Sequence, residues 1–292
     1  GGFVSNFGER YPSGSWLPES VKSLLGEKTE LKYIVYTHGH WDHMGAAGIV
    51  VEYFKDDLPT AIASRRIRDM LKSREDKDPT TAFGNTRGTP VPDVWSEDVL
   101  KVGGLRLSLN KVHAHQRGDF LVHLDKNVAE NAAQGIDTTV VMVTDTILPG
   151  WAPVYLANFA QDVGDFYEAL DTINSYNFDV LVPGHFTRLG VKEDVQTKVD
   201  FFADVLAGAE VALAEVDFSL VAVGTAITDP INNNAGNALL QFNEWVSRMV
   251  DVCETYVSDC SARGRDWFAE LPGLELFLRS QCFVVNTYVR VG

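Results

Sequence analysis

The chain has 292 residues, 45% of them hydrophobic and 22% charged, which is typical of a soluble globular protein with room for one elaborated domain or two small ones. Its 25 basic and 40 acidic residues give a net charge of −15, and such a surface repels phosphate backbones, so we expect no nucleic-acid partner. No apolar run approaches the roughly 20 residues of a membrane-spanning helix, so we expect no membrane partner either.

The first predicted elements surround a turn that is rich in metal-binding side chains. Residues 19–25 predict a short helix, residues 31–36 a buried strand, and residues 44–54 a second helix. The turn between this strand and the second helix reads Thr-His-Gly-His-Trp-Asp-His from position 37. Open α/β sheets place their functional sites at such carboxyl ends of strands.

The spacing within this turn favours a metal centre. Side chains two apart in an extended segment face the same way, so His38 and His40 can reach one cation together. Asp42 and His43 follow as the chain turns, and they can reach a second cation beside the first. Neutral imidazoles suit zinc, and a carboxylate adds negative charge. The alternative is a solvated turn, or histidines held in the core by hydrogen bonds, but it explains one histidine better than four ligands at this spacing.

The middle of the chain alternates strands and helices, as a layered α/β protein does. Residues 100–115 predict a hairpin, residues 125–137 a polar connector, and residues 75–95 either a lid over a site or a plain surface loop. The other predicted elements are strands at 60–63, 120–124, 138–143 and 179–182, and helices at 65–74 and 166–176.

From residue 191 the composition changes to that of long helices. Residues 195–216 and 235–257 predict helices, and residues 274–289 predict a helix or a strand. We interpret residues 191–292 as a helical elaboration that caps the site or forms a homodimer contact, with a purely structural role as the alternative.

All three cysteines lie in this carboxy-terminal third, at Cys253, Cys260 and Cys282. We expect them to be buried thiols. The alternative is a disulfide to Cys282, which would indicate an oxidising compartment.

The segment His38-Gly39-His40-Trp41-Asp42-His43 is followed by three later segments near the ends of predicted strands, residues 115–119, 141–145 and 183–185. Together they resemble the ordered ligand motifs of the metallo-β-lactamase superfamily, which begin with HxHxDH. This resemblance, over residues 31–190, implies an α/β fold: a four-layer αββα sandwich in residues 1–190 with a carboxy-terminal helical extension. It also implies two or more strands before residue 31, where the sequence is turn-rich instead.

The resemblance further implies two divalent cations, which we expect to be Zn²⁺, with Mn²⁺ or Fe²⁺ as alternatives. The implied ligands are His38, His40 and His115 for the first cation, Asp42, His43 and His185 for the second, and Asp145 as the bridge.

Several neighbouring residues bear on this ligand set. His113 lies on the same side of its strand as His115, but only His115 fits the family register, so we expect His113 near the pocket. His123 is predicted to be a core or surface histidine, and Asp119 to orient a ligand or cap a turn. Thr144 stands where the family usually has glycine, and we expect it to shift the backbone beside the bridge.

The predicted chemistry is hydrolysis of a carbonyl ester. Two cations about 3.5–4 Å apart lower the pKa of a bridging water to near neutral, and the resulting hydroxide attacks the carbonyl. Asp42 could pass a proton to the leaving group, and Tyr155 could donate to the oxyanion. Aromatic residues near the ligands favour an apolar or aromatic ester, above all a lactone. The predicted substrate-binding residues are Trp41, Trp151, Tyr155 and Phe186, with Arg188 for a carboxylate.

Other functions remain open at this point. The alternatives are a β-lactam or thioester hydrolase, an iron-dependent redox member of the same superfamily, and a non-catalytic binding protein on the same scaffold. The intact Asp42-His43 pair together with His185 favours two metals over one. The sequence does not decide between a cytoplasmic and a secreted protein.

Overall fold

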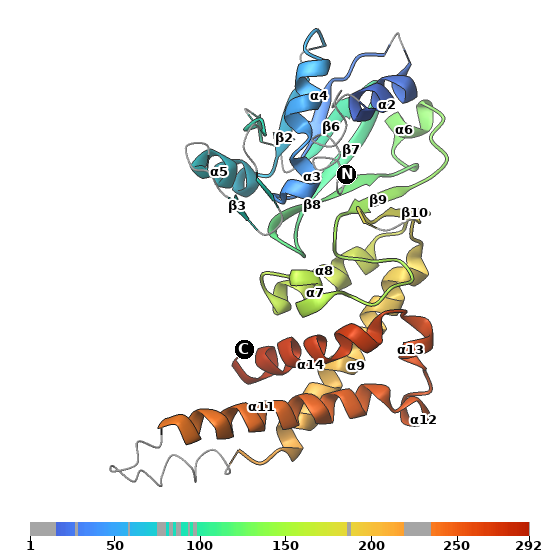
Figure 1. The fold of residues 1–292 in the computed structure, drawn as a ribbon. Helices are drawn as coiled ribbons and strands as arrows, with labels where there is room; N and C mark the ends of the chain where they lie inside the picture. Colours follow the sequence, from blue (N-terminus) through green and yellow to red (C-terminus); the bar gives the residue numbers. More distant parts are fainter. Residues whose placement is uncertain are drawn as a thin grey trace. The chain divides into compact units, whose positions relative to one another are not determined.

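The structure is a computed structural model that describes residues 16–26, 29–57, 59–74, 80–81, 84–85, 89–92, 94–95, 98–185, 188–218 and 235–291. The chain forms two compact units (Figure 1), and each is described by itself. The first unit comprises Gly1–Pro149 and Thr172–Lys192, and the second comprises Gly150–Asp171 and Glu193–Gly292. The predicted domain boundary at residue 190 stays a prediction; the units differ from it by grouping residues 150–171 with the carboxy-terminal helices.

The larger sheet of the first unit has five strands in the order β10-β9-β8-β7-β6. The four pairs β6–β7, β7–β8 and β8–β9 (antiparallel) and β9–β10 (parallel) hold it together. The turn between β7 and β8 therefore lies at the same edge of the sheet as the carboxyl ends of β9 and β10. The strands are β6 (Val99–Val102), β7 (Leu105–His113), β8 (Arg117–Leu124), β9 (Val140–Val143) and β10 (Val180–Val182).

The smaller sheet has three parallel strands in the order β1-β2-β5, formed by Tyr33–Val35, Thr60–Ala63 and Val94–Trp95. Strand β5 falls within residues 75–95, where an irregular lid or loop was predicted. The described parts of that segment also include a small hairpin, β3 (Thr80–Thr81) with β4 (Gly84–Asn85). The rest of the predicted lid lies outside the described residues.

Alternating apolar side chains join the two sheets face to face. Ile62 of the smaller sheet packs with Leu100, Leu109 and Phe120 of the larger one, and Leu109 and Phe120 are fully buried. Burial of each such side chain stabilises the fold by about 1.5–3 kcal/mol. This period-two pattern explains why the strand predictions at 60–63 and 120–124 are confirmed.

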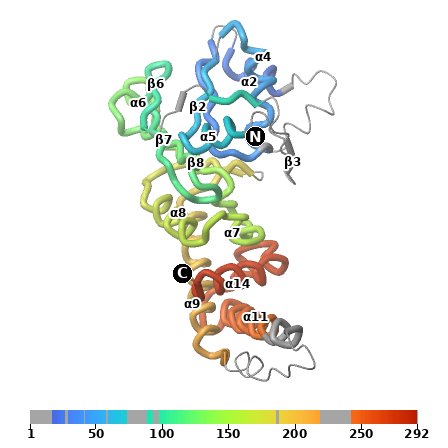
Figure 2. Tube along the Cα trace, turned by 90° about the vertical axis from the view of Figure 1, so that its left-hand side faces the viewer, coloured from blue at the N-terminus to red at the C-terminus, as the bar shows by residue number. Residues whose placement is uncertain are grey.

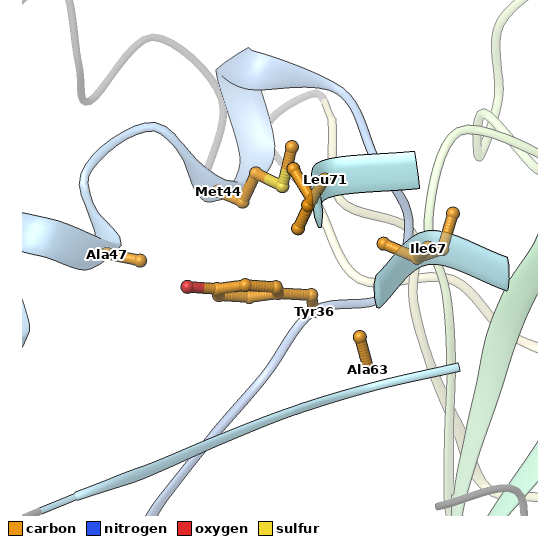
Figure 3. Close-up of a cluster of buried hydrophobic side chains, with 6 residues drawn as sticks. All are labelled: Tyr36, Met44, Ala47, Ala63, Ile67 and Leu71. Carbon is orange, nitrogen blue, oxygen red and sulfur yellow. The ribbon is translucent and has the colours of Figure 1, made fainter. Parts of the chain in front are cut away.

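Helices cover the other face of the smaller sheet. The Tyr36 ring packs among Met44, Ala63 and Leu71 (Figure 3), and its hydroxyl donates a hydrogen bond to the carbonyl of Pro90 at 3.0 Å. Tyr36 directly precedes the histidine-rich turn, so its contacts fix the start of that turn. The helices of this unit up to α5 are α2 (Trp16–Leu25), α3 (Trp41–Met44), α4 (Ala47–Tyr53) and α5 (Arg65–Arg74), so the helix predicted at 44–54 is divided in two.

The outer face of the larger sheet is also covered. Val141 and Val143 are fully buried although they point away from the inter-sheet core. The Tyr176 ring, directly after α8 (Val163–Ser175), contacts the His123 ring of β8. Helix α6 (Ala129–Ala133) lies against β7 and shortens the predicted polar connector. The predicted α/β class with a carboxy-terminal helical region is confirmed.

The second unit is built on three long helices, α9 (Lys192–Glu215), α11 (Ala235–Ser258) and α14 (Leu274–Val291), which lie together in Figures 1 and 2. The segment predicted as helix or strand at 274–289 is therefore a helix. Short helices α12 (Cys260–Arg263) and α13 (Trp267–Glu270) connect α11 to α14. None of the helices in the described ranges is both long enough and apolar enough to cross a lipid bilayer.

A disulfide between Cys253 and Cys282 joins α11 to α14, and both cysteines are fully buried. The expectation of three buried thiols is therefore wrong, and the alternative of a disulfide to Cys282 is correct. Cys260 is free and exposed because α11 ends at Ser258, which places Cys260 on a separate short helix.

The segment α7 (Tyr155–Phe159) is a left-handed turn. Leu156, Ala157 and Asn158 have φ values of 51° to 58°, a conformation that costs L-residues energy. The buried side chain of Gln281 holds this turn: its Oε1 accepts from the Ala157 amide at 2.8 Å, and its Nε2 donates to the Val154 carbonyl at 2.7 Å. These contacts offset part of the backbone strain.

Candidate metal centre

Seven metal-binding side chains come from five separate segments of the first unit. His38 and His40 follow β1, and Asp42 and His43 lie in α3. His115 lies in the turn between β7 and β8, while Asp145 and His185 follow β9 and β10. The strand pairing brings the last three to one edge of the larger sheet, so distance along the chain does not keep them apart.

Two contacts of Thr37 hold the turn after β1 against the larger sheet. The Thr37 carbonyl accepts a hydrogen bond from the Phe120 amide at 2.7 Å. The Thr144 hydroxyl donates to the Thr37 hydroxyl at 3.1 Å, and both side chains are buried. The turn that carries His38 and His40 is thereby fixed to β8 and to the residue that follows β9.

The first group of donors consists of His38, His40, His115 and Asp145, whose ligand atoms all lie within 4.8 Å of one another. Nδ1 of His40 lies 2.9 Å from Nε2 of His115. Nε2 of His38 lies 3.4 Å from Oδ2 of Asp145, and Nε2 of His115 lies 3.7 Å from the same oxygen.

The second group consists of Asp42, His43 and His185, which meet the same distance limit. The Nε2 atoms of His43 and His185 are 3.0 Å apart, and they lie 3.3 Å and 3.5 Å from Oδ2 of Asp42. Asp145 also reaches this group, with Oδ2 at 2.9 Å from His43 and Oδ1 at 3.1 Å from His185. Asp145 is thus the carboxylate that both groups share.

These donors fit divalent cations. Four ligands held 2.0–2.1 Å from a tetrahedral zinc ion are about 3.3 Å apart, and the close donor pairs named above are separated by 2.9 to 3.7 Å. Nε2 of His38 is buried and makes no hydrogen bond with any described residue, although it faces the carboxylate of Asp145. A buried nitrogen without a partner is costly, and a cation would complete its coordination.

The protonation of two of the histidines agrees with this fit. Burial lowers the pKa of His38 to about 4, and burial together with the neighbouring His115 lowers the pKa of His40 to about 4. Both imidazoles are therefore neutral at pH 7, which is the form that binds metal. The carboxylates of Asp145 and Asp42 raise the pKa of His185 to about 9, so the site attracts positive charge.

The two aspartates are ionised. Burial alone would raise the pKa of Asp145, but the nearby imidazoles of His185, His38 and His43 outweigh it and hold that pKa well below its usual range. The pKa of Asp42 is lowered in the same way, because hydrogen bonds from His185 and His43 outweigh its burial. Two carboxylates that stay charged among five imidazoles are suited to cations.

A strained backbone carries the shared carboxylate. Asp145 has φ 65°, in the left-handed region that non-glycine residues rarely adopt. Gly184, with φ 88°, faces it across the strand ends, and a Cβ added there would lie 2.4 Å from the Thr144 methyl group. The Thr144 side chain therefore does not displace the carboxylate of Asp145 from the donor cluster, because Gly184 has no side chain and leaves room for the Thr144 methyl group.

A family model described as "Metallo-beta-lactamase superfamily" matches residues 13–128, a range that includes five of the seven donors. The remaining two, Asp145 and His185, lie beyond the matched residues. Over residues 13–128 the chain is therefore similar to the metallo-β-lactamase superfamily.

A curated relative is similar to about half of the chain. The protein named "Probable metallo-hydrolase YflN" from Bacillus subtilis (strain 168) is 26% identical over 150 residues, which are 51% of this chain and 48% of YflN. The chain thus spans about half the length of this relative.

Solved structures of the superfamily show a weaker likeness. BLEG-1 B3 metallo-beta-lactamase is 17% identical, with 62% of this chain and 81% of that chain covered at a TM-score of 0.46. The archaeal superfamily protein ST1585 from Sulfolobus tokodaii is 15% identical, with coverage of 60% and 68% and a TM-score of 0.43. Both scores are below 0.5, so nothing that follows depends on them.

Three residues that the sequence placed near the superfamily's ligands lie outside the donor cluster. His113 is exposed, and its Nδ1 accepts from the Gly118 amide at 3.2 Å, so it is not a pocket residue. An irregularity in strand pairing at Val112–His113 breaks the alternation that would have put it beside His115. His123 packs on Tyr176, away from the cluster, as expected of a core or surface histidine. Asp119 caps the turn: its Oδ2 accepts from the Gln116 amide at 2.7 Å.

None of the predicted substrate-binding residues has a described contact with the donor cluster. Trp151 and Tyr155 are about half exposed and belong to the second unit, so their roles stay predictions. Arg188 is exposed and donates to the Leu189 carbonyl. Phe186 and the side chain of Trp41 lie outside the described residues.

Sequence reasoning missed two residues that shape the centre. Thr37 precedes the histidines and joins the two sheets, and Gln116 follows His115 and contacts the Gly39 amide. Their only signal in the sequence is a polar side chain directly beside a ligand, in a segment that is otherwise buried.

Proposed function

We propose that the protein is a metal-dependent hydrolase that holds two divalent cations, Zn²⁺ above all, and cleaves a carbonyl ester such as a lactone or an aromatic ester. The observation that carries this proposal is the convergence of seven donors in two groups that share Asp145. A catalytic zinc site, unlike a structural one, keeps a coordination position for water or substrate beside its protein ligands. The name of the relative YflN, a metallo-hydrolase, supports the same class of reaction.

When bound, the cations would supply Lewis acidity, which acidifies water and polarises a carbonyl. The protein's own residues would do the rest. The imidazoles of His38, His40 and His115 would hold one cation, and Asp42, His43 and His185 would hold the other. Asp145 would be shared between them, because its Oδ2 lies near His38 and His115 of the first group and near His43 of the second.

Asp42 is the residue placed to move a proton. Its carboxylate is only partly buried and stays ionised, because hydrogen bonds from His185 and His43 lower its pKa. A carboxylate at the rim of the site can take a proton from water and pass it to the leaving group. Tyr155 is proposed as the donor to the oxyanion.

The preference for an apolar or aromatic ester rests on aromatic residues that follow the shared ligand in the sequence. Trp151, Tyr155 and Phe159 are each exposed by 42% to 50%, which is unusual for rings of this size. Tyr155 contacts both Phe159 and Phe277 ring to ring. Such a surface favours apolar groups over highly charged ones.

The test is hydrolysis of a panel of lactones, aryl esters, thioesters and β-lactams by protein reconstituted with Zn²⁺, Mn²⁺ or Fe²⁺. We expect zinc-dependent cleavage of lactones or aryl esters, a loss of at least about 100-fold in kcat/KM for His38→Ala, and unchanged activity for the exposed control His113→Ala. Exclusive cleavage of thioesters or β-lactams would refute the substrate class. One iron per chain with oxygen consumption would refute the hydrolase and favour a redox enzyme.

A further inference from the structure

The side chain of Gln116 connects two ligand-bearing segments that lie 77 residues apart in the sequence. Gln116 directly follows His115, and its Oε1 accepts a hydrogen bond from the Gly39 amide at 2.7 Å. Gly39 is the residue between His38 and His40. One side chain therefore links all three histidines of the first donor group.

Gln116 is itself held in place. The backbone N–H of Gln116 donates to Oδ2 of Asp119 at 2.7 Å, and the backbone N–H of Asp119 donates to the backbone carbonyl of Gln116 at 3.1 Å. Both side chains are nearly inaccessible, with exposures of 6% and 3%. The glutamine thus starts from a rigid turn, and its acceptor atom has a defined position.

No water can take the place of this acceptor without rearrangement. A Cβ added to Gly39 would lie 2.8 Å from Oε1 of Gln116 and 2.1 Å from the Met70 terminal methyl, so the peptide is tightly enclosed. Loss of the acceptor would leave the buried Gly39 amide unpaired, and the peptide would rotate to find another partner. That rotation would turn the adjacent imidazoles of His38 and His40.

We propose that Gln116 is a positioning residue that sets the coordination geometry of the first cation by fixing the Gly39 peptide between His38 and His40. Partners that orient metal ligands typically change metal affinity by about 10- to 100-fold when they are removed. The proposal rests on the proposed function only in requiring that the centre binds metal.

The experiment measures zinc affinity by competition with a chromophoric chelator, without any substrate. Gln116→Met has nearly the same shape and no acceptor, and it is expected to weaken the tighter zinc site by about 10- to 100-fold. Gln116→Glu keeps an acceptor at the same position and is expected to stay within about threefold of the wild type. If Gln116→Met does not fold, Gln116→Asn, which draws the acceptor back by one methylene, is expected to weaken zinc binding to an intermediate extent.

A matched control separates positioning from general stability. Asn131→Ala removes buried hydrogen bonds to Arg106 and Asp125 elsewhere in the same unit, so it lowers stability without touching the centre. The proposal predicts unchanged zinc affinity for this control. It is overturned if Gln116→Met binds zinc as tightly as the wild type, or if Asn131→Ala loses as much affinity as Gln116→Met. A wild-type protein that binds no zinc would instead overturn the proposed function.

Discussion

Replacement of Gly184 by alanine tests how the strand ends shape the donor cluster. Gly184 has φ 88°, and an added Cβ would lie 2.4 Å from Cγ2 of Thr144. Alanine in the left-handed region costs about 1–2 kcal/mol. The Cβ would approach about 1 Å closer than an ordinary carbon contact of about 3.5 Å, and overpacking of this kind costs about 1–3 kcal/mol. We therefore expect Gly184→Ala to lower the free energy of unfolding by about 2–5 kcal/mol.

Gly135 offers a control in the same unit. It has φ 77°, but no atom lies within 4 Å of an added Cβ, so Gly135→Ala should cost only the conformational part. The double variant Gly184→Ala/Thr144→Ser removes the clashing methyl group, keeps the hydroxyl that donates to Thr37, and should recover most of the difference. Urea denaturation of the metal-free variants, followed by zinc titration, measures both effects. Equal losses for Gly184→Ala and Gly135→Ala would show that the close contact with Thr144 is not what constrains this position.

Three further predictions concern stability away from the centre. Burial lowers the pKa of His123, so its protonation favours the unfolded state, and the free energy of unfolding falls as the pH drops below the unfolded pKa of 6.5. The variant His123→Phe should therefore lose less stability than the wild type between pH 7 and pH 5, and an equal loss would contradict this. The Cys253–Cys282 bridge closes a loop of 29 residues, so Cys253→Ala/Cys282→Ala should destabilise the helical unit by about 3–4 kcal/mol in urea, and an effect below about 1 kcal/mol would contradict this. Asn131→Ala removes three hydrogen bonds from a fully buried side chain, and calorimetry should show a loss of about 2–4 kcal/mol; a surface-like loss under about 0.5 kcal/mol would count against that role.

The sequence predicted the donors because their chemistry is local. Histidines and an aspartate at fixed spacing after a strand are visible without tertiary structure, and the structure brings all seven predicted donors together. The strands were predictable for a similar reason, because alternation between buried and exposed positions follows from the pleat. His113 was misplaced by that same rule, since the pairing irregularity at Val112–His113 has no sequence signature.

Other features depend on contacts that a single sequence does not show. The Cys253–Cys282 bridge requires α11 and α14 to lie side by side, which spacing along the chain does not determine. The left-handed turn at Tyr155–Phe159 requires the buried Gln281 from a helix more than a hundred residues later. The hydrogen bond from the Gly39 amide to the Gln116 side chain is likewise a tertiary contact between two loops. In each case a distant partner overrides local preference.

Zinc stoichiometry tests the account most directly. The purified protein, stripped with a chelator and reconstituted, is measured by mass spectrometry of its metal content per chain. We predict two zinc ions per chain for the wild type, about one for His185→Ala, which loses a donor of the second group only, and fewer than one for Asp145→Ala, which loses the shared carboxylate. A wild-type protein that retains no zinc, or a full complement of zinc in Asp145→Ala, would contradict the two-cation centre.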